Sequence, residues 1–144
     1  MKKMICTAVG VLGSLIASAF GGWTASLTTL LIFMAIDYIS GLTVAGVFHR
    51  SPKTESGALE SRAGFKGLVR KLMILFFVLI GHRLDLAVGM RVIRDAVCIG
   101  FIANELLSIT ENAGLMGLPV PAVIRNAIDI LNKKNAEGSV EKHG

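Results

Sequence analysis

One segment, Leu27–Phe48, constrains this chain more than any other, because it runs for 22 residues with a single charged residue, Asp37, near its middle. A helix rises about 1.5 Å per residue, so this segment is long enough to cross a bilayer core of about 30 Å. A carboxylate at that depth opposes insertion by about 2.5–3.5 kcal/mol. Such a group usually faces protein or water rather than lipid. We therefore expect a membrane protein in which Asp37 has a functional role.

The composition is too apolar for an ordinary soluble domain. The 144 residues are 53% hydrophobic, and the mean hydropathy is +0.66. Only 6% are aromatic while 16 are glycine, which is typical of membrane helices that pack through small residues. The net charge is +5, but the basic residues flank apolar segments and no nucleic-acid-binding motif accompanies them. We expect a partner in the lipid bilayer and none in nucleic acid.

Small residues recur every four positions in the first 25 residues, which favours close packing of two helices. The expected packing positions are Gly10, Gly13, Ser14, Ala17, Ser18 and Gly21, with Gly41 and Ala45 in the second segment. Lys2 and Lys3 followed by an apolar run also resemble a secretory signal that could be cleaved near Ala19. Because the small residues are not confined to a cleavage site, we expect this segment to be retained as a helix.

The apolar pattern predicts spans near 4–21, 27–48, 68–90 and 96–113 within a transmembrane helical domain of residues 1–118. The first two spans would form a hairpin that turns near Gly21–Trp23. The fourth segment could insert, lie flat or re-enter, which leaves three or four crossings open. An amphipathic helix follows at 119–132, and a polar cytoplasmic tail without periodicity at 133–144. The predicted fold is an all-α integral membrane protein with three to four transmembrane helices plus a short C-terminal amphipathic helix.

Basic residues that follow the second span set the expected orientation. Lys and Arg are absent from Met4 to His49 and then cluster as Arg50, Lys53, Arg62, Lys66, Arg70 and Lys71. By the positive-inside rule this stretch lies on the cytoplasmic side, and Lys2 and Lys3 put the N-terminus on the same side. We expect these residues to hold topology at the membrane surface, and lean to four crossings with both ends in the cytoplasm.

A polar stripe marks the fourth segment. Asn104, Glu105, Ser108, Glu111 and Asn112 fall on a single helical face, opposite an apolar one. Together with Asp37 and Asp85 they are the candidates for lining a pore or for contacts between copies. Each could bond to another helix or contact water, and for the stripe we favour water. A chain with so few spans cannot enclose a wide hole, so a sizeable pore requires a homo-oligomer.

Signatures of catalysis and metal binding are missing from the sequence. No nucleophile elbow, phosphate-binding glycine loop or HExxH motif is present. Cys6 and Cys98 stand singly, and no histidine has a partner at ligand spacing. His82 and Asp85 could form an acid–base pair, although neutralising charge at a membrane edge is the preferred interpretation. We expect no enzyme, no catalytic residue, no metal and no cofactor.

Five segments together resemble the bacteriophage lysis and toxin-secretion holin family. They are Asp37–Leu42 with Ala45, Ser61–Lys71, Leu84–Asp85, Asn104–Asn112 and Gly117–Pro121, in that order. The resemblance implies a phage-encoded protein of the host bacterial cytoplasmic membrane that oligomerises and opens lesions for an endolysin or a large toxin. It also implies that Asp37, Gly41, Gly67, Lys71, Asp85, Asn104, Glu105, Ser108, Glu111 and Asn112 occupy the family's characteristic positions.

The function expected from the sequence is therefore that of a phage holin whose lesions release endolysin to the cell wall and cause lysis. The alternative is a small ion or metabolite channel, or a transporter subunit, that uses Asp37, Asp85 and Glu105 as coordinating carboxylates. A third possibility is a non-conducting adaptor that recruits a partner through the helix near Val120–Leu131.

Overall fold

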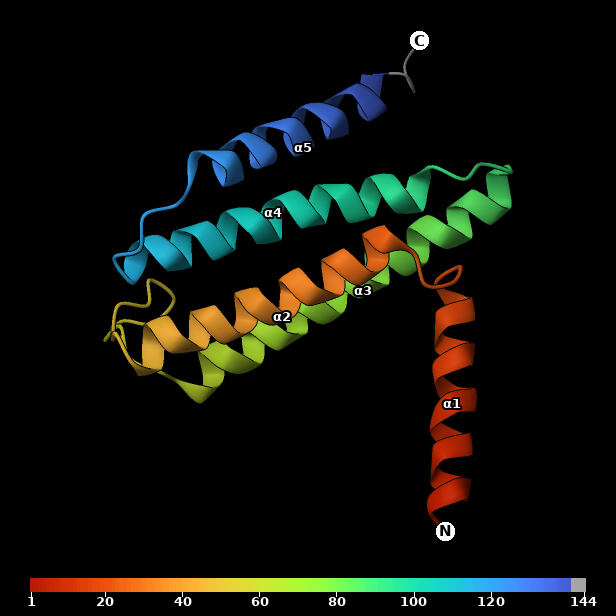
Figure 1. The fold of residues 1–144 in the computed structure, drawn as a ribbon, viewed down its shortest axis with the longest axis horizontal. Coiled ribbons are helices and arrows are strands. Elements are labelled where there is room, and N and C mark those ends of the chain that lie inside the picture. Colours follow the sequence, from red (N-terminus) through yellow and green to blue (C-terminus); the bar gives the residue numbers. More distant parts are fainter. Residues whose placement is uncertain (141–144) are drawn as a thin grey trace.

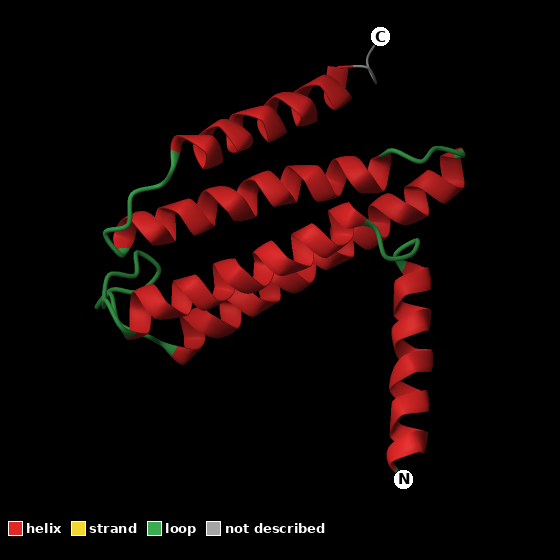
Figure 2. Ribbon diagram, viewed as in Figure 1, coloured by secondary structure: helices red, strands yellow, loops and turns green. Residues whose placement is uncertain are grey.

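The computed structural model describes residues 1–140, and every regular element in that range is an α-helix (Figure 2). The helices are α1 (Lys2–Ala19), α2 (Ala25–Gly46), α3 (Ser61–Val88), α4 (Ile93–Leu115) and α5 (Ala122–Val140). The all-helical fold class is confirmed for this part of the chain. By length and composition α1 and α2 could each cross a membrane. A crossing by α3 or α4 stays a prediction.

Helix α4 occupies the centre of the fold. It packs against α2 and α3 on one side and against α5 on the other, so that α5, α4 and the α2–α3 pair form successive layers (Figure 1). The apolar core lies between α2, α3 and α4 and consists of Leu27, Leu30, Met34, Ile74, Val78, Cys98 and Ile102. Burial of such side chains stabilises the bundle by about 1.5–3 kcal/mol each.

Local sequence signals explain where the bundle helices begin and end. Helix α2 begins after Thr24, whose hydroxyl accepts a hydrogen bond from the backbone N–H of Leu27 at 3.3 Å. Helix α3 ends at Gly89, which adopts a left-handed conformation with φ of 69° and so turns the chain back sharply. The loop at 47–60 and the start of α3 lie at the opposite end of the bundle from this turn (Figure 1).

Helix α1 projects away from the bundle, and the expected hairpin with α2 is not formed in the single copy (Figure 1). Ala17 is its one buried residue. Gly21 and Gly22, with φ of 83° and 91°, redirect the chain between the two helices. Arg94 then holds this turn by donating hydrogen bonds to the carbonyls of Phe20 and Gly21, at 2.8 and 3.1 Å.

Two helix boundaries differ by more than three residues from those predicted. Helix α3 begins at Ser61 rather than near 68, because the basic stretch is rich in good helix formers and its glycines let Tyr38 of α2 pack closely. Helix α5 runs to Val140 and so continues into the predicted tail, beyond the expected helix end at residue 132. That stretch lacks proline, and Asn135 lies beside Gly100 of α4. Residues 141–144 lie outside the described range.

Candidate functional site

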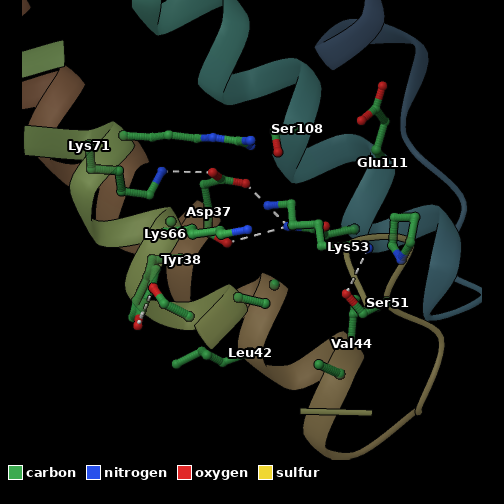
Figure 3. A pocket seen from close by; sticks show the side chains of 18 of the residues that line it. Asp37, Tyr38, Leu42, Val44, Ser51, Lys53, Lys66, Lys71, Ser108 and Glu111 are labelled. Atoms are coloured by element: carbon green, nitrogen blue, oxygen red, sulfur yellow. Dashed lines mark hydrogen bonds and ion pairs between the residues drawn. The ribbon is translucent and has the colours of Figure 1, made fainter. Parts of the chain in front are cut away.

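An ionic network joins the three bundle helices. The Nζ atom of Lys71 on α3 lies 2.7 Å from Oδ2 of Asp37 on α2 (Figure 3). The same atom lies 2.7 Å from Oε2 of Glu105 on α4. The exposed fractions of the Asp37 and Glu105 side chains are 8% and 4%, and that of Lys71 is 14%. A single ammonium group therefore ties together three helices in a site largely closed to solvent.

Asn112 of α4 completes the network on the side away from Lys71. Its Nδ2 donates to Oδ1 of Asp37 at 3.2 Å, to the backbone carbonyl of Asp37 at 3.3 Å and to Oγ of Ser40 at 2.8 Å. Both carboxylate oxygens of Asp37 are thus bonded, one to an ammonium and one to an amide. Among residues whose side chains are described, no buried polar side-chain atom lacks a hydrogen-bond partner.

The network continues the stripe of each helix that forms the apolar core. Asp37 follows the core residue Met34 by three positions, and Glu105 follows Ile102 by three. Lys71 likewise precedes the core residue Ile74 by three. Residues three apart lie on the same face of a helix, so the packing that buries the core also brings these charges together. The ionic network therefore follows from the helix registers rather than from any local motif.

The charge of the network is not balanced within itself. Two carboxylates face one ammonium, so the cluster carries one net negative charge when both acids are ionised. Removing one partner of a buried pair typically costs about 3–5 kcal/mol, because the remaining charge is left uncompensated. The network contains no nucleophile and no histidine, and its chemistry is charge neutralisation between helices.

A pocket of about 520 Å³ opens beside the network, at the end of the bundle where α2 stops and α3 begins. Figure 3 shows side chains from α2, α3, α4 and the 47–60 loop around it. All five residues of the predicted stripe line this pocket, namely Asn104, Glu105, Ser108, Glu111 and Asn112. Glu105 and Asn112 are buried at its base, while Asn104 and Glu111 are exposed.

Asp85 lies at the other end of the bundle, away from these residues. Its Oδ1 and Oδ2 accept hydrogen bonds from the backbone N–H groups of Ile93 and Arg94, at 2.8 and 3.0 Å. The first backbone N–H groups of a helix have no partner within it, so Asp85 caps α4. The sequence spacing suggested that Asp85 could pair with His82. In the structure its carboxylate accepts hydrogen bonds from these two N–H groups instead.

The residues expected to pack helices fall into three sets. Ala17, Gly41 and Ala45 lie within the fold, with Ala17 and Ala45 buried and Gly41 beside Asn112. Gly10 and Gly13 of α1 have no atom within 4 Å of the position where a side chain would begin, and Ser14 and Ser18 are exposed. Contact between copies through this open side of α1 stays a prediction. Gly21 shapes the turn to α2.

Sequence reasoning missed the position of Lys71. Its neighbours in the basic stretch are exposed, and Lys71 was grouped with them as a residue of the membrane surface. The signal that could have separated it is its place directly before the apolar run Leu72–Gly81. Lys71 lies three residues before the core residue Ile74 and so on the same face of the helix. The role of Ser40, three residues after Asp37, was missed as well.

The sequence of this chain is similar to those of known proteins. The bacteriophage holin family matches residues 14–133, which is most of the chain and includes the whole network. The chain belongs to this family. The resemblance read from the five segments is thereby confirmed.

Relatives cover three quarters or more of this family member. An uncharacterized protein of Listeria monocytogenes is 40% identical over 132 residues, covering 91% of this chain and 88% of its own. An uncharacterized protein of Clostridium perfringens is 35% identical over 136 residues, covering 92% of this chain and 95% of its own. A protein of Bacillus phage phi105 named a probable holin is 32% identical over 110 residues, covering 76% of each chain. No solved structure matches the chain.

Family membership and the two apolar helices together indicate a membrane protein. The holin family is not an enzyme family.

Proposed function

We propose that this protein is a phage holin that accumulates in the host bacterial cytoplasmic membrane, associates into homo-oligomers and opens lesions. Through these lesions an endolysin reaches the cell wall and the host lyses. Support comes from the family match over residues 14–133 and from the relative in phage phi105 that is named a probable holin.

We infer four crossings, by α1 to α4, with the 47–60 loop in the cytoplasm. Helices α3 and α4 carry more charge than a simple span, but Lys71 and Glu105 are ion-paired and Asp85 is hydrogen-bonded inside the bundle. Between Leu72 and Ile80 the exposed residues of α3 are all large and apolar, among them Phe76. A charge that is satisfied internally removes most of the cost of inserting its helix into lipid.

The observation that carries the proposal is the two-sided surface of the bundle. The side formed by α2 and α3 exposes large apolar residues: Ile32, Ile36, Ile39, Leu72, Met73, Phe76, Phe77 and Ile80. On the other side helix α5, which covers α4, exposes mainly polar residues, Arg125, Asn126, Asp129 and Asn132, with the apolar Val123 and Ile130 among them. Lipid suits the first side and is unfavourable for the second.

Such a surface favours assembly with one particular orientation of the copies. Copies that turn their α4–α5 sides toward one another keep α2 and α3 in contact with lipid and enclose polar groups among themselves. A small cluster satisfies these groups by contacts between copies, and a larger ring surrounds water. The exposed α1, which contributes a further apolar helix to each copy, then extends the contact with lipid or with a neighbour.

The network residues are expected to control this conversion, which gives the direct test. The protein and an endolysin are co-expressed from an inducible promoter in a bacterium, and culture turbidity and entry of an impermeant dye are followed. Asp37→Ala and Glu105→Ala should change the time of lysis or abolish it, because each leaves Lys71 with one partner. Glu55→Gln, in the exposed 47–60 loop, is the matched control and should lyse on time. Unchanged timing in both network variants would remove the network from the mechanism.

The same experiment separates the alternative function. A small ion channel or transporter subunit would pass ions and dissipate the membrane potential without release of a folded endolysin. The position of Lys71 argues against this alternative, because its ammonium already occupies the place between the two carboxylates that a transported cation would need.

A further inference from the structure

The pocket beside the network is lined by four cations and four acids, but outside the network itself the cations are in excess. Its ionisable lining residues are Lys53, Lys66, Arg70 and Lys71, together with Asp37, Glu60, Glu105 and Glu111. Lys71 is bonded to Asp37 and Glu105. Within residues 1–140 the side chains of Lys53, Lys66 and Arg70 form no ion pair. Glu60 and Glu111 are the two lining acids outside the network. The three cations therefore exceed these two acids by one positive charge at the mouth of the pocket.

The mouth of the pocket adjoins an apolar strip on the same helix. Lys66 and Arg70 line the pocket, and the residues directly before them, Phe65 and Val69, are exposed to 67% and 45%. Leu72 continues this exposed strip toward the middle of α3. A cationic rim and an apolar strip on adjacent faces of one helix match a ligand that has an anionic head and a hydrocarbon tail.

We propose that this pocket binds the headgroup of an anionic phospholipid through its phosphodiester. The phosphate lies against Lys66 and Arg70, and the acyl chains run along the strip that begins at Phe65. A phosphodiester carries one negative charge, which equals the surplus at the mouth. Arginine is well suited to phosphate because its planar guanidinium donates two parallel hydrogen bonds.

Size and the remaining polar groups agree with a headgroup that donates hydrogen bonds. A volume of about 520 Å³ falls in the range of small-molecule sites, and it suits a glycerol phosphate better than a bare ion. The carboxylates of Glu60 and Glu111, which line the pocket and have no ion-pair partner in the described chain, can accept from headgroup hydroxyls. A choline headgroup lacks such donors, and this predicts a preference for phosphatidylglycerol over phosphatidylcholine.

The test compares two pairs of substitutions that remove equal charge from the same end of the molecule. K66Q/R70Q takes two cations from the pocket, while R50Q/R62Q takes two exposed cations that do not line it. Full-length protein in detergent is titrated with dihexanoyl phosphatidylglycerol, dihexanoyl phosphatidylcholine and glycerophosphoglycerol, and binding is read by native mass spectrometry. Circular dichroism verifies that both variants keep their helical content.

We expect phosphatidylglycerol to bind more tightly than phosphatidylcholine, and K66Q/R70Q to weaken it on the order of thirtyfold. R50Q/R62Q should change it by less than about threefold. Equal losses in the two pairs would mean diffuse attraction to a basic surface and would overturn the site. Glycerophosphoglycerol that binds as well as the lipid would overturn the role of the apolar strip. None of these readouts depends on lysis, so the site can fail while the holin function stands.

Discussion

Among single residues, Lys71 holds together the buried acids of two other helices. It stands 34 residues from Asp37 and 34 from Glu105 in sequence, and it contacts both at 2.7 Å. Neither carboxylate pairs with another cation in the part of the chain that the structure describes. The interior of the bundle therefore depends on one ammonium group.

Replacing Lys71 by Met should destabilise the bundle by about 3–5 kcal/mol, because two neighbouring carboxylates lose their shared cation. The triple variant D37N/K71M/E105Q removes all three charges and should recover much of that loss. Thermal unfolding in detergent, followed by circular dichroism, measures both effects. Equal destabilisation of the single and the triple variant would show that the three side chains are not coupled through charge.

At the scale of elements, α4 organises the molecule because it alone packs against α2, α3 and α5. Its start is fixed by Asp85 of α3, and Gly81 of α3 allows the two helices to approach: a Cβ atom there would lie 3.1 Å from Cα of Arg94. The turn at Gly89 and this close contact together set the registers of α3 and α4. Those registers in turn bring Lys71 and Glu105 opposite each other.

Asp85→Ala should loosen the start of α4 by about 1 kcal/mol, since two backbone N–H groups lose their acceptor. Asp85→Asn keeps an oxygen that can accept and should restore most of the stability. Hydrogen exchange of the amides of Ile93 and Arg94 reports the change. Asp129→Ala, on the exposed side of α5, is the control and should leave these amides protected. Unaltered exchange in Asp85→Ala would refute the capping role.

At the scale of the whole molecule, the bundle and α1 differ in how well they are covered. The bundle buries a continuous core and its ionic network, whereas α1 exposes nearly all of its side chains. An apolar helix left uncovered in one copy has to be covered by lipid, by detergent or by another copy.

The two cysteines report this difference directly. Cys6 on α1 is exposed and Cys98 on α4 is fully buried in the core, so N-ethylmaleimide should modify Cys6 rapidly in detergent and leave Cys98 intact. Cys98 should react only after denaturation. Mass spectrometry of the labelled protein measures both sites, and a Cys98→Ala variant assigns the signals. Rapid reaction of both cysteines in the folded protein would contradict the packing of α4.

Local periodicity in the sequence determines much of this protein. It predicts the all-helical class, the apolar segments, the common face of Asn104 to Asn112 and the amphipathic pattern of α5, because each depends on residues three or four apart on one helix. The resemblance in five segments also predicts the family. Helix ends were less accurate, as at 133–140, because packing against α4 adds to weak intrinsic preferences.

Only the tertiary structure decided which of these helices face one another. Lys71 lies in the basic stretch of the sequence, but the packing of α3 places it in the interior of the bundle. Asp85 was grouped with Asp37 as an acidic residue near an apolar segment, but it caps α4 at the opposite end of the bundle. The direction of α1 likewise depends on the turn at Gly21–Gly22 and on Arg94, more than 70 positions away. Hydrophobic periodicity states which face of a helix is buried, but the partner of a buried charge depends on how separate helices are placed in space.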